Sequence, residues 1–210
     1  MARLWPVGRR FAILGAAIVL VAGTASAAGG PFHRHAIPGY GTSIALPSSW
    51  KTVDYRQVLK TGDLDQLARD NPELAGSFAA MAQPDSPIKL FAYDPQVAKG
   101  FATNANVVVV PLGGPVGFTE YERQLVGELR TLSSVSKLRS STVRLPAGRA
   151  VRLSYRLGVN AHGRVLSVQT LQYALLNGRR SVVVTYSTLP AAARFYSGVF
   201  TTSARSIRFS

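Results

Sequence analysis

The sequence contains no cysteine, only 10 acidic residues and only three histidines among its 210 residues. The lack of cysteine excludes disulfide bonds, thiol nucleophiles, and zinc or iron–sulfur centres held by cysteine. Charged residues make up 16% of the chain and hydrophobic residues 47%. A chain of this length and hydrophobicity favours one folded domain with its own core, and it excludes disorder over the whole length.

The few acidic residues are also unevenly placed along the chain. Lysine and arginine number 24 against 10 Asp and Glu, for a formal net charge of +14. All ten acidic residues lie between Asp54 and Glu128, whereas the segment from Leu129 to Ser210 contains 13 basic residues and no acidic one. A basic surface of this kind attracts polyanions. The alternative is that these side chains are spread around the domain, where the more acidic first half balances them.

Residues 1–27 have the pattern of a secretory signal peptide. Arg3, Arg9 and Arg10 precede a 12-residue apolar run, Phe11 to Ala22, and Ala25-Ser26-Ala27 supplies small residues for cleavage. A helix of 12 residues is about 18 Å long, which is too short to cross a hydrocarbon core of about 30 Å. We therefore expect cleavage after Ala27 and an extracytoplasmic mature protein without a transmembrane span. Retention of this segment as an N-terminal anchor is the alternative.

The rest of the chain is predicted to be a flexible tail, residues 28–38, followed by a single domain, residues 39–210. Runs rich in β-branched and aromatic residues predict strands at 40–47, 51–55, 88–93, 106–111, 142–145, 149–157, 164–176 and 180–187. Four consecutive valines, 107–110, indicate a strand covered on both faces. Asn177-Gly178 predicts a two-residue hairpin turn.

Helices are expected at three places between or after these strands. Residues 63–82 read as a helical insertion. Thr119 and Glu122 form a capping-box pattern that places the start of a helix at Thr119, and Pro190 opens a final helix. Because strands are grouped and alternating βαβ units are absent, the pattern predicts an α+β fold. We expect a mostly antiparallel sheet flanked by helices on both faces, an αβα sandwich.

The order of these elements resembles the PsbP-like secreted domain. That fold is shared by a photosystem II extrinsic subunit, a nuclear Ran-binding protein and bacterial lipoproteins of the LpqN type. The resemblance rests on Tyr40-Gly-Thr-Ser-Ile-Ala-Leu-Pro-Ser-Ser-Trp50, Gln172-Tyr-Ala-Leu-Leu-Asn-Gly178, Ser181-Val-Val-Val-Thr-Tyr-Ser187 and the closing segment Phe200 to Phe209. It implies the sandwich fold and no chemistry, because its members are binding or assembly proteins.

Catalytic and cofactor motifs are missing from the sequence. It has no nucleophile elbow, no P-loop and no dinucleotide fingerprint. His33 and His35 flank Arg34 and would share one side of an extended chain as half of a metal site, but no third ligand is near, which favours a solvated tail. His162 is placed in an exposed loop, and Asp85 and Asp94, beside prolines, in turns. We therefore expect no catalytic residue, metal or cofactor; a small secreted hydrolase or metal-dependent enzyme with an unrecognised site is the alternative.

Five arginines of the last third are the candidate binding residues. Arg152 and Arg156 share one face of the strand 149–157, about 13 Å apart at about 3.3 Å per residue. Arg164, Arg179 and Arg180 lie at strand ends and at the hairpin turn. The sequence thus predicts an exported, non-catalytic binding or assembly domain. Its expected partner is an envelope protein, an anionic polymer or a lipid headgroup, since nucleic acid suits an exported protein less well.

Overall fold

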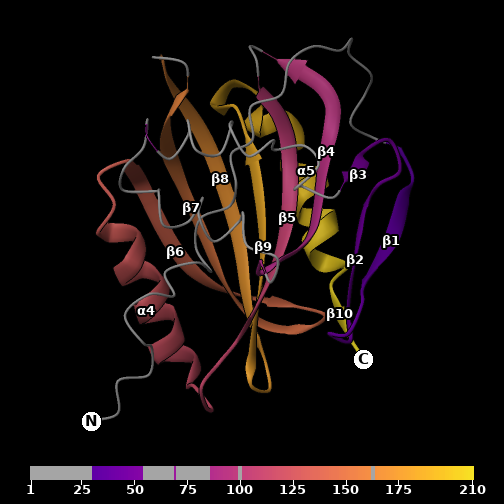
Figure 1. Cartoon of the computed structure of the whole chain (residues 1–210), viewed down its shortest axis with the longest axis vertical. Helices are drawn as coiled ribbons and strands as arrows, with labels where there is room; N and C mark the ends of the chain where they lie inside the picture. The colour runs from indigo at the N-terminus through magenta and orange to yellow at the C-terminus, as the bar shows by residue number, and fades with distance from the viewer. Residues whose placement is uncertain (1–29, 54–68, 70–85, 99–100, 162–163) are drawn as a thin grey trace.

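The computed structural model describes residues 30–53, 69, 86–98, 101–161 and 164–210 (Figure 1). The predicted signal peptide, residues 1–27, lies outside the described residues, as does His162. Of the predicted helical insertion at 63–82 only Arg69 is described, and it is helical.

A seven-stranded antiparallel sheet forms the centre of the protein. Its order is β3 (Lys51–Val53), β4 (Ile88–Ala98), β5 (Phe101–Pro111), β9 (Arg180–Thr188), β8 (Arg164–Asn177), β7 (Gly148–Ala161) and β6 (Val135–Leu145). The valines 107–110 on β5 are all buried, as their uninterrupted apolar run predicts. A two-residue hairpin turn joins β8 to β9, as predicted, but its loop residues are Gly178 and Arg179, because Asn177 still pairs with Arg180. Gly178 has a φ of +60°. The prediction of a mostly antiparallel α+β fold is confirmed.

The strands extend further than the sequence indicated. β5 begins at Phe101 and β6 at Val135, and β7 continues past the predicted end at residue 157 to Ala161. The extensions mix polar and small residues with apolar ones, so the local pattern did not mark them as strands. They are held instead by long antiparallel pairing with their neighbours in the sheet.

A second, three-stranded sheet corrects the prediction of a flexible tail at 28–38. β1 (Phe32–Ile37) pairs along its length with β2 (Thr42–Pro47), and β10 (Arg208–Phe209) pairs with the other edge of β2. The three polar residues of β1, His33, Arg34 and His35, are consecutive, so its sequence shows no strand-like alternation. Backbone pairing to β2 holds it, and its last residue, Ile37, is buried in the core.

Two helices are described, besides a short 3-10 turn, η2 (Pro190–Ala192), that leads into the second of them. α4 (Phe118–Arg130) follows β5, and α5 (Ala193–Arg205) follows β9. The predicted capping box is wrong. The N-cap is Gly117, which places Thr119 inside the first turn, and the Glu122 carboxylate accepts a hydrogen bond from Thr142 of β6, at 3.4 Å. The N-cap of α4 therefore lies two residues earlier than the Thr119–Glu122 spacing implied.

Each face of the large sheet carries its own hydrophobic core. On one face, Tyr121, Leu125 and Leu129 of α4 pack with inward-facing side chains of the central strands. On the other, Tyr196, Val199 and Phe200 of α5 pack with the alternate side chains and with the small sheet. In Figure 1, α5 lies behind the sheet, whereas α4 lies at the β6 end. The expected αβα sandwich is therefore borne out only in part, because α4 packs beside β6 rather than across its whole face.

Candidate binding site around Tyr40

The five predicted arginines lie at three separate places. Arg152 and Arg156 are half-buried on the α5 side of β7, opposite the buried Val151 and Leu153, as the alternation predicted. Arg164 is exposed at the start of β8, paired with Ala161. Arg179 and Arg180 lie at the opposite end of the same strand, at the β8–β9 turn. Arg179 and Arg180 line a cavity.

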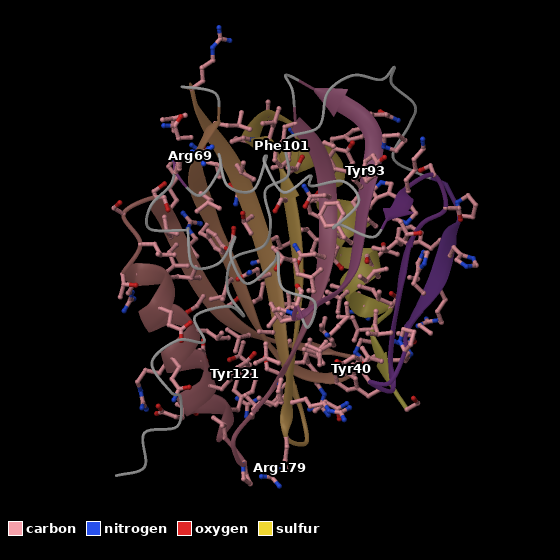
Figure 2. All side chains as sticks on the ribbon, in the orientation of Figure 1. Tyr40, Arg69, Tyr93, Phe101, Tyr121 and Arg179 are labelled. Carbon is pink, nitrogen blue, oxygen red and sulfur yellow. The ribbon has the colours of Figure 1, made fainter. Side chains whose placement is uncertain are left out.

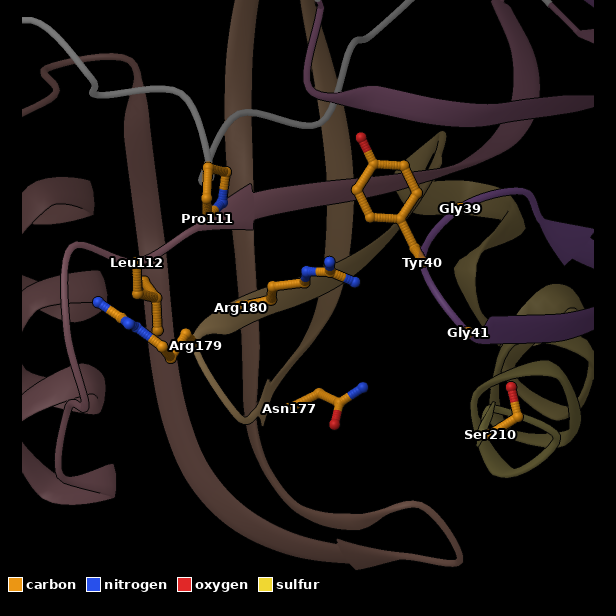
Figure 3. Close-up of a pocket in the computed structure, with 9 residues that line it drawn as sticks. All are labelled: Gly39, Tyr40, Gly41, Pro111, Leu112, Asn177, Arg179, Arg180 and Ser210. Carbon is orange, nitrogen blue, oxygen red and sulfur yellow. The ribbon is translucent and has the colours of Figure 1, made fainter.

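This cavity, which we call the Tyr40 site, has a volume of about 610 Å³. It opens between the β1–β2 turn and the β8–β9 turn (Figure 3). Its lining residues are Gly39, Tyr40, Gly41, Pro111, Leu112, Asn177, Arg179, Arg180 and Ser210. Figure 3 shows Arg180 extending toward Tyr40, whereas Arg179 extends toward Leu112. Segments from both ends of the chain therefore meet at one opening.

Two cations face the Tyr40 ring. The Lys89 ammonium lies 5.3 Å from the ring centroid and the Arg180 guanidinium carbon 5.4 Å from it. Both distances fall within the roughly 6 Å over which an aromatic face attracts a cation. The Lys89 ammonium also donates to the Ser86 carbonyl at 2.8 Å, which fixes its position. The ring thus holds two positive charges close to one cavity.

The β1–β2 turn positions Tyr40 through its glycines. Gly39 and Gly41 have φ angles of +79° and +55°, a backbone region that side chains disfavour. A Cβ at Gly41 would lie 2.7 Å from the Ser210 carbonyl oxygen, and the Ser210 N–H donates to the Gly41 carbonyl at 2.8 Å. These close approaches require glycine and present the Tyr40 ring to the cavity.

The β8–β9 turn is fixed as firmly. The Leu112 N–H donates to the Arg179 carbonyl at 2.8 Å, and the Arg179 guanidinium donates to the Gly113 carbonyl at 3.4 Å. Arg180 is the first residue of β9 and pairs with Pro111 of β5. The backbone that carries Arg180 is therefore anchored on both sides.

No acidic side chain lines the described part of this cavity. The acidic residues of the described segments lie elsewhere: Asp94 on β4, and Glu120, Glu122 and Glu128 on α4. Glu120 pairs with Arg123 on its own helix. The described lining of the Tyr40 site thus includes two arginines and no acidic side chain, in keeping with the acid-free last third of the sequence.

Sequence reasoning missed Tyr40 and Lys89 as site residues. Tyr40 was taken as the first residue of a strand, but its two flanking glycines mark a turn and are the signal that could have identified it. Lys89 gives no such signal, because its approach to Tyr40 depends on how β4 lies beside the β1–β2 turn.

Asp94 corrects another expectation. It lies within β4 at a register shift, not in a turn, and is only 2% exposed. Its carboxylate accepts hydrogen bonds from the Tyr196 hydroxyl at 2.8 Å and from the Gln96 N–H at 3.0 Å. Burial first, and then the neighbouring Asp94, raise the pKa of Tyr196 far above its usual value. Tyr196 therefore remains a neutral donor, and the pair joins α5 to β4.

The His33 and His35 rings lie on one side of β1, with centroids 5.1 Å apart, as their spacing predicted. Among the described residues no group of three or more His, Asp or Glu side chains gathers to ligate a metal. Partial burial, and then the neighbouring His33, lower the pKa of His35. Protonation of His35 is thus less favourable in the folded protein than in the unfolded chain.

This lowered pKa predicts a pH dependence of stability. Around pH 6 the unfolded chain binds more protons at His35 than the folded one does, so stability falls as pH decreases through the ordinary histidine pKa of about 6.5. We expect a lower melting temperature at pH 5.5 than at pH 7.5, and a smaller difference in His35→Gln. The effect is small because solvent screens this half-buried ring. An undiminished difference in His35→Gln would assign the dependence to other groups.

The topology and the two-faced core define an α+β domain with the PsbP-like fold. Three solved structures share it. The cyanobacterial PsbP (CyanoP) of Synechocystis sp. PCC 6803 matches with a TM-score of 0.53 and 15% identity, over 90% of this chain and 98% of that one. LpqN of Mycobacterium tuberculosis, described as involved in cell envelope biogenesis, matches with 0.51 and 10%, over 89% and 90%. The Ran-binding protein Mog1p of Saccharomyces cerevisiae matches with 0.53 and 9%, over 86% and 96%.

At these identities the likeness establishes the fold alone. No protein-family model matches the sequence, and no curated protein matches it either. Within the described segments, neither helix has the length and apolar character needed to cross a bilayer.

Proposed function

We propose that this protein is an extracytoplasmic, non-catalytic binding domain that holds an anionic group of an envelope component at the Tyr40 site. The observation that carries the proposal is the convergence of Lys89 and Arg180 on Tyr40, beside a cavity whose described lining has no acidic side chain. Like charges held close together repel each other, and a bound anion relieves that repulsion. Binding of an anion at the Tyr40 site therefore lowers its electrostatic free energy.

Phosphate is the anion chemistry that suits this site best. An arginine guanidinium donates two parallel hydrogen bonds to phosphate oxygens, and a lysine ammonium adds a point charge. The cavity opens at the surface between two turns, so a phosphate carried on a lipid headgroup or on a polymer can enter without unfolding the domain. The proposed location outside the cytoplasm rests on the signal-like residues 1–27, and the envelope role attributed to LpqN agrees with it.

Binding to vesicles and to a soluble polymer tests this proposal. The mature chain is mixed with phosphatidylglycerol-containing vesicles, phosphatidylcholine vesicles or inorganic polyphosphate, and the bound fraction is measured at rising salt. We expect binding to one of the two phosphate sources and a steep loss with salt. Arg180→Ala should weaken binding about tenfold or more, because a hydrogen bond to a charged group contributes about 1.5–3 kcal/mol and 1.4 kcal/mol is a factor of ten.

Arg164→Ala is the matched control, since it removes the same charge from the opposite end of β8. An equal loss in both variants would show that overall charge, and not the Tyr40 site, attracts the anion. Binding to phosphatidylcholine as strong as to phosphatidylglycerol would argue against an anionic ligand altogether.

A further inference from the structure

The strand β1 carries two of the three histidines of the sequence, His33 and His35. The three-stranded sheet has the order β1-β2-β10, so β1 is an edge strand among the described residues. It forms the right-hand border of the molecule in Figure 1, and Figure 2 shows side chains that project outward from it. His33 is exposed and His35 is partly exposed, so both rings are accessible to an ion in solution.

The strand conformation holds both histidine rings on the same side of the chain, because successive side chains of a strand point to opposite faces. The two ring centroids are 5.1 Å apart. A metal ion about 2.0–2.1 Å from one nitrogen of each ring, with a tetrahedral angle between the two bonds, places the centroids about 5 Å apart. The rings therefore already have the separation that a shared ion requires. Rotation about χ2, which is soft in histidine, turns the nitrogens toward that ion.

The cation between the two histidines is directed away from them. Arg34 belongs to the opposite face of β1, where its guanidinium donates to the Ser43 hydroxyl and to the Ser206 carbonyl, both at 3.0 Å. On the histidine face, the residues directly opposite on β2 are Leu46 and Ile44. Neither of these two residues carries a charge, so they do not repel a metal ion held between the rings.

An imidazole ligates a metal ion only in its neutral form. Partial burial, and then the neighbouring His33, lower the pKa of His35. At pH 7.5, which is above even the ordinary histidine pKa of about 6.5, the His35 ring is therefore available as a ligand.

We propose that His33 and His35 together bind one divalent ion of the late first-row transition metals, and that they hold Cu²⁺ most tightly. Imidazole suits Cu²⁺, Ni²⁺ and Zn²⁺, and nitrogen ligands bind Cu²⁺ the most strongly of the three. Among the described residues no third histidine or acidic side chain joins the pair, so water fills the remaining coordination positions.

The pairing of β1 with β2 is what makes two ligands sufficient for measurable binding. In a flexible tail, the two histidines would lose conformational entropy when an ion brought them together. In β1 the register with β2 has already fixed the backbone that carries them. Once one imidazole has bound the ion, the second is present at a high effective concentration. This site shares no residue with the Tyr40 site, so the inference is independent of the proposed anion binding.

Calorimetric titration of the untagged mature chain with Cu²⁺ at pH 7.5 tests the proposal. We expect saturable binding to the wild-type protein. His33→Gln removes one ligand at an exposed position and should weaken the binding about tenfold or more, since the loss of even an outer-shell partner costs 10–100-fold. Mg²⁺, which prefers oxygen ligands, should not bind at this site.

Two further variants separate the histidine pair from the mere number of histidines. His33→Gln/Ala36→His keeps three histidines but puts those of β1 on opposite faces, so it should bind Cu²⁺ as weakly as His33→Gln. His162→Gln removes the histidine outside β1 and should bind like the wild type, as should Arg180→Ala. No binding to the wild type, or wild-type affinity in His33→Gln or in the double variant, would overturn the proposal.

Discussion

Phe200→Ala is expected to lower the free energy of unfolding by about 3–5 kcal/mol, the range for removing a buried aromatic side chain. Phe200 is 3% exposed and stacks between two tyrosines of the α5-side core, with ring centroids 4.8 Å from Tyr186 and 5.8 Å from Tyr196. Its removal leaves a cavity between two rings whose hydroxyls are fixed by hydrogen bonds to Ser203 and Asp94. The surrounding structure therefore has little freedom to collapse into the space. Urea denaturation followed by fluorescence measures the change.

Phe195→Ala is the control for this experiment. Phe195 lies on the same helix and contacts Tyr196 edge-on at 5.1 Å, but it is 59% exposed. Its replacement should change the free energy of unfolding by no more than about 0.5 kcal/mol. Equal effects of the two replacements would mean that α5 does not turn its Phe200 face toward the sheet.

Leu129→Ala is expected to cost about 2–5 kcal/mol. Leu129 is fully buried in the last full turn of α4 and belongs to the core on the opposite side of the sheet from Phe200. It acts together with Tyr121, whose hydroxyl is hydrogen-bonded to Ser181 of β9. Leu129 has the lowest exposed fraction of the three buried residues of α4, so its loss should also speed amide exchange along the helix. A stability loss with unchanged exchange in α4 would contradict this assignment.

The double variant Phe200→Ala/Leu129→Ala tests whether the two cores are independent. The two residues share no contacts and are separated by the sheet. Their costs should then add to within about 0.5 kcal/mol. A coupling energy well above this value would mean that the sheet transmits strain between its faces.

Several features could be predicted because the residues that cause them are neighbours in sequence. The four valines 107–110 indicated a strand buried on both faces, and the alternation around Arg152 and Arg156 indicated one apolar and one polar face of β7. The Asn177-Gly178 pair indicated a tight turn. In each case the periodicity or the turn chemistry lies within ten residues of chain. The class of fold and its antiparallel sheet follow from such local features.

The errors arose where a distant segment decides the outcome. β1 has three consecutive polar residues at its centre and becomes a strand because β2 pairs with it. Asp94 looks like a turn residue beside Pro95, but the Tyr196 hydroxyl, from a helix about a hundred residues away, makes it a buried member of β4. Thr119 and Glu122 carry the letters of a capping box, but Gly117 begins the helix and Glu122 contacts β6 instead.

The sequence alone determined the α+β class, most of the strands and the acid-free character of the last third, because composition and period are properties of the chain itself. Only the tertiary structure decided which charged side chains lie close to one another. It separated the five candidate arginines into three places and brought Lys89 and Arg180 close to the Tyr40 ring. It also directed the Arg34 guanidinium to the Ser206 carbonyl, away from the two histidines of β1. Strand register and packing set these distances, and no local pattern of residues encodes them.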